Sequence, residues 1–559
     1  MSVLTPARQP AGPYDCCVIG AGPVGLALAM EAVQTGARVL LVDAGNAHSG
    51  GRAVSASSGQ RTEIVDPARH APISLTTRQA VGGTSWLWGG RCVAYEPIDF
   101  EARAYVPGVQ WPIGPDDVAP WYGAAARHLD CGAPVFHSPH PDWNGLSEIR
   151  MTNLERWSRQ PRLGRDLGAR VIAHRSVTAL LDSHLIDIEF DDGGAVSCVV
   201  VVRAGRLERL RAASYVLAMG GLEVTRLLLG VQRRRPTAFG GTGGPLGRYY
   251  MGHATGTIAD IVLLDPARAA DLDFARDESD TYIRRRFTLT EDAQRRHRLL
   301  NTSFALDNPA FSAHEHRNAT LSAVFLGIAI PPIGRAVLAE GIRLRHVGPR
   351  PYRIAAHVRN VLRTPWRAVA DVADILHRRY LSRVRKPGFL LRNDGGRYAL
   401  RYHGEQLPHP DSRLTIASDE TGTEVLRVDF RYSEADIDSL LRCHEILDGE
   451  LRSAGIGRLE YHAAGASAIR AAAWDQATDG FHSIGTTRMS ADPALGVVDG
   501  DCRVHGVANL YIASSSVLPT SAEANPTFIA AALAVRLAHH LAERRSRGPV
   551  SDVAEGIGG

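Results

Sequence analysis

The sequence predicts an α/β protein with two domains: a discontinuous domain on a doubly wound parallel sheet, and a second domain on a mostly antiparallel sheet with helices. Three observations predict this fold class. A glycine-rich turn joins a strand to a helix near the amino terminus, another glycine-terminated strand begins at residue 214, and short strands of alternating pattern lie after residue 411. At 559 residues the chain is also too long for one simple core.

The first predicted unit is a β-α-β segment. Residues 14–19 predict a strand, the apolar spacing from Leu26 to Val33 predicts a helix, and residues 38–42 predict the next strand. Gly20-Ala-Gly-Pro-Val-Gly25 separates the first strand from the helix. Asp43, whose carboxylate would accept hydrogen bonds from a ribose, follows the second strand. This combination is the dinucleotide-binding fingerprint in its expected context.

Each residue of the glycine-rich turn has its own physical role. We expect Gly20 to permit the tight turn, Gly22 to let the backbone approach a pyrophosphate, and Gly25 to let helix and strand pack closely. Pro23 and Val24 begin the helix, whose free N–H groups and positive dipole end would face the phosphates.

The rest of the chain favours FAD over NAD. Residues 214–221 predict another strand, which ends in Gly220-Gly221 and leads into a helix, and residues 513–519 predict a third segment near the nucleotide. An NAD domain is usually contiguous, whereas a site assembled from the start, middle and end of a chain suits a larger, permanently held flavin. The alternative is that residues 214–221 form an ordinary strand of the sheet with its glycine turn.

Two polar residues near the carboxyl terminus are candidates for catalysis. His482 lies in Phe481-His-Ser-Ile-Gly485, and Asn525 lies in Glu523-Ala-Asn-Pro-Thr527, directly before an apolar run. The pKa of an ordinary histidine lies near neutrality, so His482 can accept a proton from a hydroxyl. The Asn525 amide can hold the oxygen without competing for that proton. The alternative is a core histidine and a helix-capping asparagine.

These segments together resemble the glucose–methanol–choline (GMC) family of FAD-dependent oxidoreductases, over nearly the whole chain. The resemblance is carried by the order and spacing of residues 20–25 with Asp43, 79–90, 176–180, 218–228, 246–253 and 482–541. Within the family, Gly485-Thr-Thr-Arg-Met489 and Ala524-Asn-Pro-Thr527 most resemble the bacterial, pyranose-oxidase-like branch, in which the catalytic pair is His and Asn.

The resemblance implies a set of site residues. His482 would take the hydroxyl proton of an alcohol while hydride moves to the flavin, and Asn525 would orient the oxygen. The residues that it assigns to FAD are Gly20, Gly22, Pro23, Val24, Gly25, Asp43, Gly82, Gly83, Thr84, Trp88, Gly89, Val177, Gly220, Ser514, Ser515, Asn525, Pro526 and Thr527. No metal is expected.

The chain departs from the family pattern at two positions. Some relatives bind the flavin covalently through a histidine, and the matching position here is Leu87, so we expect non-covalent FAD. Ser514 stands where the family usually has an aspartate, which removes one carboxylate contact; backbone N–H groups of Ser515 and Ser516 can still serve.

The predicted domain limits follow from these segments. The FAD domain comprises residues 12–110, 165–260 and 476–545, and the substrate domain comprises 111–164 and 261–475, with disordered tails at 1–11 and 546–559. In the substrate domain, residues 412–416 and 425–430 predict sheet strands, and helical spacing begins at Ile437.

Residues 335–386 form an unusually basic insertion. They hold 13 basic and 3 acidic residues, a local balance of +10 in a chain whose total is +4. Ile354, Val358 and Leu362 share one helical face, and Pro365 opens a second helix with Trp366 on its apolar face. The pattern predicts a basic helical hairpin. It either packs by its apolar side with a solvated basic face, or contacts an anionic membrane surface, an acidic partner or a charged substrate.

Composition sets the remaining expectations. No run of about 18 apolar residues exists, the first fifteen residues lack a secretory apolar region, and the seven scattered cysteines suit a reducing compartment, so we expect a cytoplasmic protein. Aromatic residues are sparse in the basic segment and no nucleic-acid-binding module is recognisable, so nucleic acid is not an expected partner.

The expected activity is oxidation of an alcohol, with a sugar, glycoside or aminocyclitol-type polyol favoured by the resemblance. A small aliphatic or sterol-like alcohol stays open, as does the electron acceptor: oxygen, a quinone or a carrier protein. Two other classes of function remain, an NAD(P)-dependent dehydrogenase and a flavin-containing lyase or binding protein without net redox chemistry.

Overall fold

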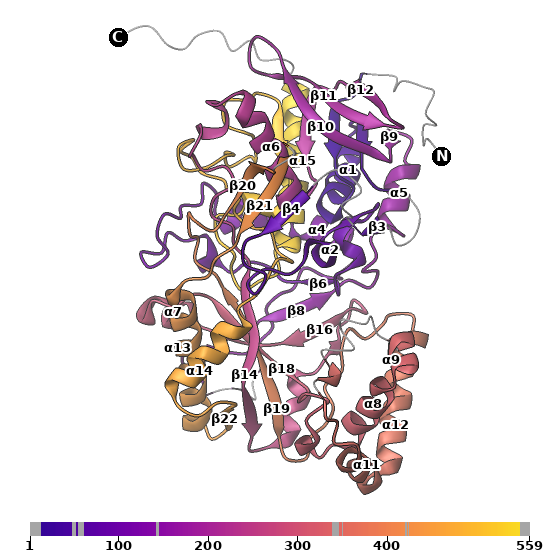
Figure 1. Ribbon diagram of the computed structural model, residues 1–559, viewed down its shortest axis with the longest axis vertical. Coiled ribbons are helices and arrows are strands. Elements are labelled where there is room, and N and C mark those ends of the chain that lie inside the picture. Colours follow the sequence, from indigo (N-terminus) through magenta and orange to yellow (C-terminus); the bar gives the residue numbers. More distant parts are fainter. Residues whose placement is uncertain are drawn as a thin grey trace.

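The computed structural model describes residues 13–46, 52–53, 61–140, 143, 145–337, 346–348, 350–419, 422 and 424–547. The predicted amino-terminal tail lies outside the described residues. The predicted carboxyl-terminal tail does so too, except for Ser546 and Arg547, which end the last helix. The molecule is elongated, with a parallel sheet in its upper half and an antiparallel sheet in its lower half (Figure 1).

The upper half is built on a five-stranded parallel sheet in the order β23-β13-β1-β2-β9. Its strands come from the beginning, middle and end of the chain: β1 (Cys16–Ile19), β2 (Val39–Val42), β9 (Val177–Leu180), β13 (Ser214–Leu217) and β23 (Leu510–Ile512). All neighbouring strands are parallel. Their nearly continuous apolar sequences fit this position, because a parallel sheet is buried on both faces.

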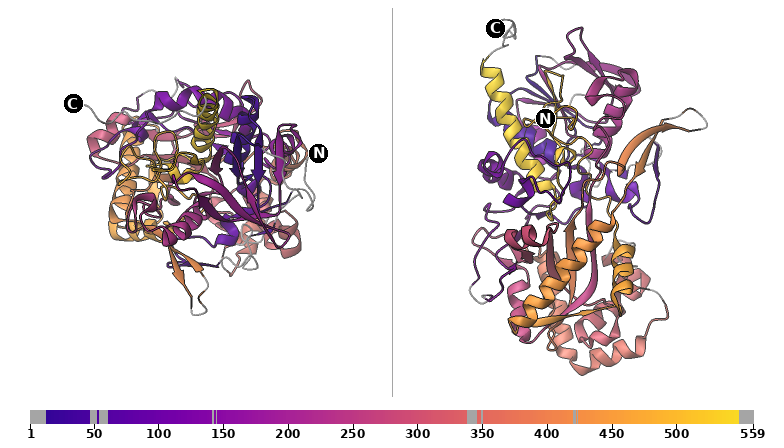
Figure 2. Two further views of the ribbon diagram at one scale, coloured as in Figure 1. Left: turned by 90° about the horizontal axis from the view of Figure 1, so that it is seen from above. Right: turned by 90° about the vertical axis from the view of Figure 1, so that its left-hand side faces the viewer.

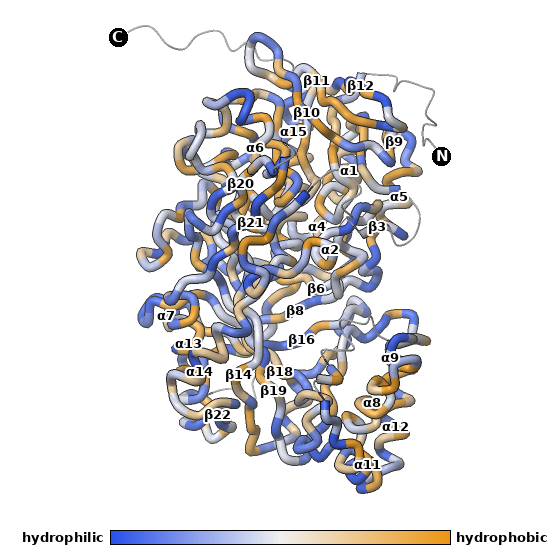
Figure 3. Tube along the Cα trace, viewed as in Figure 1, coloured by the Kyte–Doolittle hydropathy of each residue, from blue (hydrophilic) through white to orange (hydrophobic). Residues whose placement is uncertain are grey.

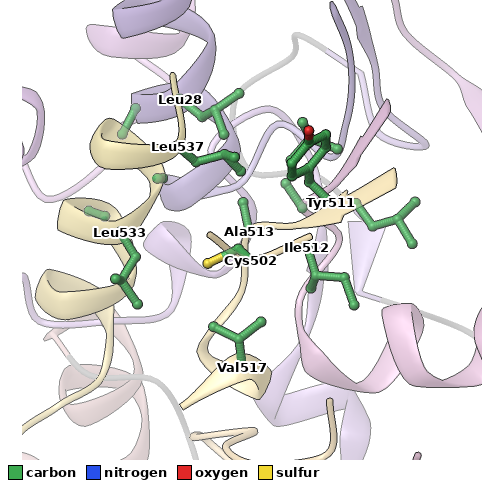
Figure 4. Close-up of a cluster of buried hydrophobic side chains, with 14 of the residues drawn as sticks. Leu28, Cys502, Tyr511, Ile512, Ala513, Val517, Leu533 and Leu537 are labelled. Carbon is green, nitrogen blue, oxygen red and sulfur yellow. The ribbon is translucent and has the colours of Figure 1, made fainter. Parts of the chain in front are cut away.

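Helices cover this sheet. The main ones are α1 (Pro23–Gln34), α5 (Leu167–Ala173), α6 (Gly221–Arg234) and α15 (Thr527–Arg547). Helices α1 and α15 pack directly against each other. Leu28 of α1 and Leu533 and Leu537 of α15 belong to one buried cluster with Ile512 of β23 (Figure 4). The end of the chain is therefore part of the same core as its beginning.

The lower half is built on a six-stranded antiparallel sheet in the order β22-β14-β19-β18-β17-β7. Its strands are β7 (Ile149–Arg150), β14 (His253–Leu263), β17 (Phe287–Leu289), β18 (Thr302–Asp307), β19 (Arg397–Glu405) and β22 (Gly457–Tyr461). Helices α13 (Glu434–Ser453) and α14 (Ala466–Gln476) lie against it (Figure 2). Strand β14 begins within the predicted limits of the FAD domain, but it pairs with β19 and β22 of the six-stranded sheet.

Both strands predicted after residue 411 form, as β20 (Arg413–Ser418) and β21 (Glu424–Asp429). Their place in the predicted substrate domain implied that they would join the six-stranded sheet, but they do not. Strand β21 pairs instead with β20 on one side and with β4 (Arg61–Ile64) on the other, in a three-stranded sheet, and β20 packs against α6. The predicted helix near Ile437 is α13.

The remaining elements are shorter or peripheral. One antiparallel sheet consists of β10 (Ser183–Phe190), β11 (Val196–Arg203) and β12 (Arg206–Leu210). A second consists of β6 (Arg91–Cys92), β8 (Leu154–Trp157), β15 (Ala275–Arg276) and β16 (Tyr282–Arg285). A third pairs β3 (Arg52–Ala53) with β5 (Arg78–Gln79). The short helices are α2 (Ile73–Thr76), α3 (Pro115–Val118), α4 (Tyr122–Leu129) and α7 (Glu291–His297).

The basic insertion contains the predicted helices. These are α11 (Ile354–Arg363) and α12 (Pro365–Leu376), which pack on α8 (Ala319–Ala329) next to α9 (Pro331–Val337). Of the two alternatives, packing by the apolar side is wrong, because the large apolar side chains are exposed: Ile354, Val358, Leu362, Trp366, Val369 and Leu376. None of the described helices combines the length and apolar character needed to cross a bilayer.

Candidate active site

A cavity of about 460 Å³ opens at the carboxyl ends of the parallel strands. Its wall includes Ile19 at the end of β1, Val42 at the end of β2 and Ala218 after β13. It reaches from Asp43 on one side to His482 on the other. Ligands of open α/β sheets bind at this edge, and the volume is that of an ordinary cofactor or ligand site.

Three helices begin at the cavity wall. Val24 in the first turn of α1, Leu222 in the first turn of α6, and Thr527 at the start of α15 all line it. The first turn of a helix offers unpaired N–H groups and a positive dipole end. The cavity therefore provides the donors that the pyrophosphate of a dinucleotide requires.

The glycine-rich turn has the geometry that its sequence predicts. Gly20 has φ +111°, and a Cβ there would lie 2.4 Å from the carbonyl oxygen of Ala218, so a side chain is excluded. At Gly22, by contrast, a Cβ would meet no atom within 4 Å, and this residue faces the cavity. The open space beside Gly22 lets a phosphate approach the backbone.

Asp43 has a structural contact that the fingerprint alone did not reveal. Its carboxylate is partly buried and accepts hydrogen bonds from the backbone N–H of Ala21 at 2.6 Å and of Gly45 at 2.7 Å. Burial raises the pKa of Asp43 to about 6, against the lowering effect of these two donors. The carboxylate lines the cavity, and each oxygen keeps a lone pair for a ribose hydroxyl.

Most of the predicted cofactor residues share this cavity. Those that line it are Gly20, Gly22, Pro23, Val24, Asp43, Gly83, Thr84, Gly220, Ser514, Ser515, Pro526 and Thr527. The others, Gly25, Gly82, Trp88, Gly89, Val177 and Asn525, are not part of the wall. Gly25 packs against Gly20, Trp88 donates from its indole N–H to the carbonyl of Pro161 at 2.5 Å, and Val177 begins β9.

Ser514 caps a short helical turn. Its Oγ accepts from the N–H of Ser516 at 3.3 Å, at the start of residues Ser515–Val517. Ser515 donates from its own hydroxyl to the carbonyl of Ser483 at 2.8 Å. These bonds connect the end of β23 to the segment that carries His482.

The structure brings His482 and Asn525 together. The Asn525 amide nitrogen Nδ2 lies 2.9 Å from Nε2 of His482, and Nδ1 of His482 lies 3.1 Å from Oδ2 of Asp479. An amide N–H and a carboxylate fix the tautomer: Nδ1 carries the proton and donates to Asp479, while Nε2 keeps its lone pair and accepts from the Asn525 amide. Oδ1 of Asn525 is buried and has no hydrogen-bond partner among the described residues.

Asp479 was missed by the sequence reasoning. Its Oδ1 accepts from the N–H of Gly480 and Phe481, and its Oδ2 accepts from the N–H of His253 at 2.8 Å as well as from His482. Burial alone would raise the pKa of Asp479, but His482 and His253 outweigh it and hold that pKa well below its usual range. Asp479 is therefore a buried anion that faces the imidazole of His482. Its position three residues before His482 was the one signal in the sequence.

Two further histidines come from the antiparallel sheet. Nδ1 of His253, at the start of β14, lies 3.0 Å from Nδ1 of His482, and the His253 ring stacks on that of His403 from β19 at 4.2 Å. Burial lowers the pKa of both His253 and His403, so both are neutral near pH 7. Their other contacts are to backbone carbonyls, His253 to Ser521 and His403 to Glu523.

The three imidazoles also have the composition of a metal site. Nitrogens of His253, His403 and His482 lie within 4.8 Å of one another. Each of the two buried rings nevertheless turns one nitrogen toward a backbone carbonyl, and Nδ1 of His482 is engaged with Asp479. We therefore interpret the three imidazoles as a hydrogen-bonded arrangement that supports His482, rather than as a metal site.

Comparison with known proteins gives two family matches and several relatives. Residues 408–534 match the family model described as GMC oxidoreductase, and residues 18–77 match the model of an NAD(P)-binding Rossmann-like domain. The chain is 22% identical to 2-methyl-1,2-propanediol dehydrogenase of Mycolicibacterium austroafricanum, over 95% of this chain and 96% of that protein. It is 32% identical to 6'''-hydroxyparomomycin C oxidase of Streptomyces lividus over a quarter of each chain.

A solved structure supports the fold over the whole length. Pyridoxine 4-oxidase from Mesorbium loti superposes with a TM-score of 0.52 at 16% identity, covering 94% of this chain and 99% of that one. The Rossmann-like match explains the phosphate turn, and the GMC match covers the segment that carries His482 and Asn525. The carboxyl-terminal part of the chain therefore matches the GMC oxidoreductases, the fold of nearly the whole chain is that of a solved oxidase structure, and the dinucleotide of the cavity is FAD.

Proposed function

We propose that the enzyme oxidises a CH–OH group of a sugar, glycoside or aminocyclitol-type polyol to a carbonyl, with His482 as the base and Asn525 as the group that holds the oxygen. The observation that carries the proposal is the contact of 2.9 Å between Asn525 Nδ2 and His482 Nε2 at the edge of the cofactor cavity. One hydroxyl can engage both groups, since the amide donates to its oxygen and the imidazole accepts its proton.

The chemistry divides between cofactor and protein. FAD, when bound, supplies the two-electron acceptor for the hydride of the carbinol carbon. Nε2 of His482 takes the hydroxyl proton, so that the alcohol becomes a carbonyl without a free alkoxide. The Asp479 carboxylate stabilises the imidazolium that forms, because it already faces Nδ1. Asp479 is a positioning residue in this proposal, since it acts through His482.

The residues around the cavity support non-covalent FAD. Leu87, at the position where some relatives carry a linking histidine, has no group that can bond to a flavin. We expect acid or heat to release intact FAD, which chromatography of the supernatant would identify. Flavin that stays in the protein pellet would contradict this.

Two observations support a sugar-like substrate. Three of the relatives similar over part of the chain are named as oxidases of aminoglycosides or C-glycosides. Phe481 lines the cavity next to His482 and is 60% exposed, so its ring can pack on the apolar face of a sugar. A small diol is the second candidate, because the relative that spans nearly the whole chain is named for one.

The test is reduction of the bound flavin without oxygen. Purified holoenzyme is mixed anaerobically with a panel of glycosides, aminocyclitols, 1,2-diols and simple alcohols, and bleaching of the flavin absorbance is followed. We expect the glycosides and aminocyclitols to react fastest. Bleaching by diols alone would assign the enzyme to the second candidate, and bleaching by none would favour a flavin-containing lyase.

His482 is tested by His482→Ala. We expect the variant to keep its FAD while substrate reduces the flavin at least about a hundredfold more slowly, as loss of a positioned base predicts. An unchanged rate of flavin reduction would remove His482 from the role.

A further inference from the structure

The outer surface of α11 and α12 carries large apolar side chains that face solvent. Leu362 near the end of α11 is 70% exposed, and Trp366 and Val369 at the start of α12 are 83% and 61% exposed. Only Thr364 separates the two helices, so these side chains gather at one elbow. We call this surface the elbow patch; it comprises Ile354, Val358, Leu362, Trp366, Val369 and Leu376.

The inner side of the same helices is polar. His357 and Asn360 of α11 are buried, and both form hydrogen bonds to the hydroxyl of Ser322 on α8, at 3.0 and 3.1 Å. Asp371 of α12 accepts from the hydroxyl of Thr320 at 2.7 Å. A helix pair that packs in water normally buries its apolar face. Here hydrogen bonds and the Phe325 ring stacked on His357 hold α11 against α8, and the large apolar side chains of α11 and α12 face outward.

Positive charge borders the elbow patch. Arg353 directly before α11, and Arg359 and Arg363 on it, are exposed and form no ion pair with a carboxylate among the described residues. Arg383 and Arg385, after α12, are exposed and without such a pair in the same part of the chain. On the helix, Arg359 and Arg363 each directly follow an apolar residue of the patch, Val358 and Leu362.

Acidic groups near the patch are already engaged. Asp371 bonds to Thr320, and Asp374 pairs with Arg378 at 2.7 Å. A second copy of the chain would bring the same arginines face to face, which like-charge repulsion disfavours. The charge selects an anionic partner, and the exposed Trp and Leu select one that also accepts apolar side chains.

We propose that the elbow patch docks the enzyme peripherally on an anionic lipid bilayer. Trp366 and Leu362 enter the headgroup region, while Arg359 and Arg363 extend to lipid phosphates. Interfacial helices bind in this way, by burying an apolar face and attracting anionic lipids with basic flanks. The proposal does not depend on which alcohol is oxidised. In Figures 1 and 3 the patch helices lie at the lower end of the molecule, away from β12 at the upper end.

The test is co-sedimentation of the full-length holoenzyme with vesicles. One set contains phosphatidylcholine alone, and the other contains phosphatidylcholine with phosphatidylglycerol. We expect binding to the anionic vesicles, little binding to the neutral ones, and a bound fraction that falls as salt rises. The double variants Leu362→Ser/Trp366→Ser and Arg359→Gln/Arg363→Gln should each bind at least about tenfold more weakly.

The matched control removes the same kinds of side chain from the other end of the molecule. Arg206→Gln/Leu207→Ser on β12 changes an exposed arginine and a leucine that is 65% exposed. It should bind like the wild type, and all variants should keep the melting temperature and FAD content of the wild type. Absence of binding to anionic vesicles at low salt overturns the proposal, as does equal binding to neutral vesicles. A dimer in light scattering that the Leu362/Trp366 variant dissociates would assign the patch to a second copy instead.

Discussion

Asp479→Asn is the substitution that tests the site most directly, because it changes one charge and almost no volume. In the wild type, Oδ1 of Asp479 accepts from the N–H of Gly480 and Phe481, and Oδ2 accepts from His253 N and His482 Nδ1. An asparagine can satisfy only one of these pairs with its carbonyl oxygen. If the carbonyl keeps the two adjacent N–H groups, the amide N–H₂ faces His482.

The expected decrease in the rate of flavin reduction follows from two effects of Asp479→Asn. Losing a hydrogen bond to a charged group costs about 1.5–3 kcal/mol, which is about a 10- to 150-fold effect when it applies to the imidazolium of the transition state. The amide also favours the tautomer with the proton on Nε2, which removes the lone pair that receives the substrate proton. The same exchange beside a catalytic histidine in a Ser-His-Asp triad lowers turnover about 10⁴-fold. We therefore expect flavin reduction to slow by about 10² to 10⁴-fold.

The assay is anaerobic stopped-flow reduction of the bound flavin, with FAD content and melting temperature measured on the same samples. Asp436→Asn is the control, because Asp436 is a buried carboxylate that caps α13 and has no hydrogen bond to His482. It should lower stability and leave the rate of flavin reduction within about tenfold of the wild type. The reasoning is refuted if Asp479→Asn binds FAD and reduces it at the wild-type rate, or if the control slows it equally.

Three further predictions follow from particular residues. Asn525→Ala should slow flavin reduction by about 10- to 100-fold with little loss of FAD, because one orienting hydrogen bond is lost; stopped-flow kinetics check this. Gly20→Ala should destabilise the fold, because the added Cβ meets the Ala218 carbonyl, whereas Gly22→Ala should leave the melting temperature of the apoprotein unchanged and weaken FAD binding in a titration. Burial lowers the pKa of His403, so the folded protein disfavours its protonation and the free energy of unfolding falls as pH drops below the unfolded pKa of about 6.5. His403→Asn should reduce this dependence of the unfolding free energy on pH by up to about 1.4 kcal/mol per pH unit. Denaturant unfolding between pH 7 and 5 checks this.

Local motifs were the predictable part of this molecule. The β-α-β unit could be predicted because Gly20, Gly22 and Asp43 take their roles from neighbours in sequence. His482 and Asn525 could be proposed as catalytic candidates from their local sequence segments, although the sequence gives no distance between them. The presence of α13 followed from the apolar spacing that begins at Ile437.

Long-range placement was not predictable in this way. His253 and His403 lie on two paired strands of one sheet, and strand pairing cannot be predicted from a short sequence segment. The contacts of these two histidines around His482 were therefore missed. Strands β20 and β21 were predicted, but the sheet that they form was not, because the residue pattern of a strand does not identify the strand with which it pairs. Periodicity revealed the apolar faces of α11 and α12, yet it does not say whether a face points inward.

The position of His482 depends on both halves of the molecule at once. Its loop is tied to the parallel-sheet half by the bond from Ser515 to Ser483, while its ring contacts His253, which begins the antiparallel sheet. Asp479 joins the two, because it accepts from the backbone of His253 and from the ring of His482. A small change in the contact between the halves would therefore move His482, the proposed base, relative to the cofactor cavity without altering either sheet. In the proposed reaction the hydroxyl oxygen loses its proton while the adjacent carbon loses hydride, so such a shift should reduce the rate more than it reduces FAD binding. Substitutions at the junction that preserve melting temperature and FAD content but slow flavin reduction would be the signature of this arrangement.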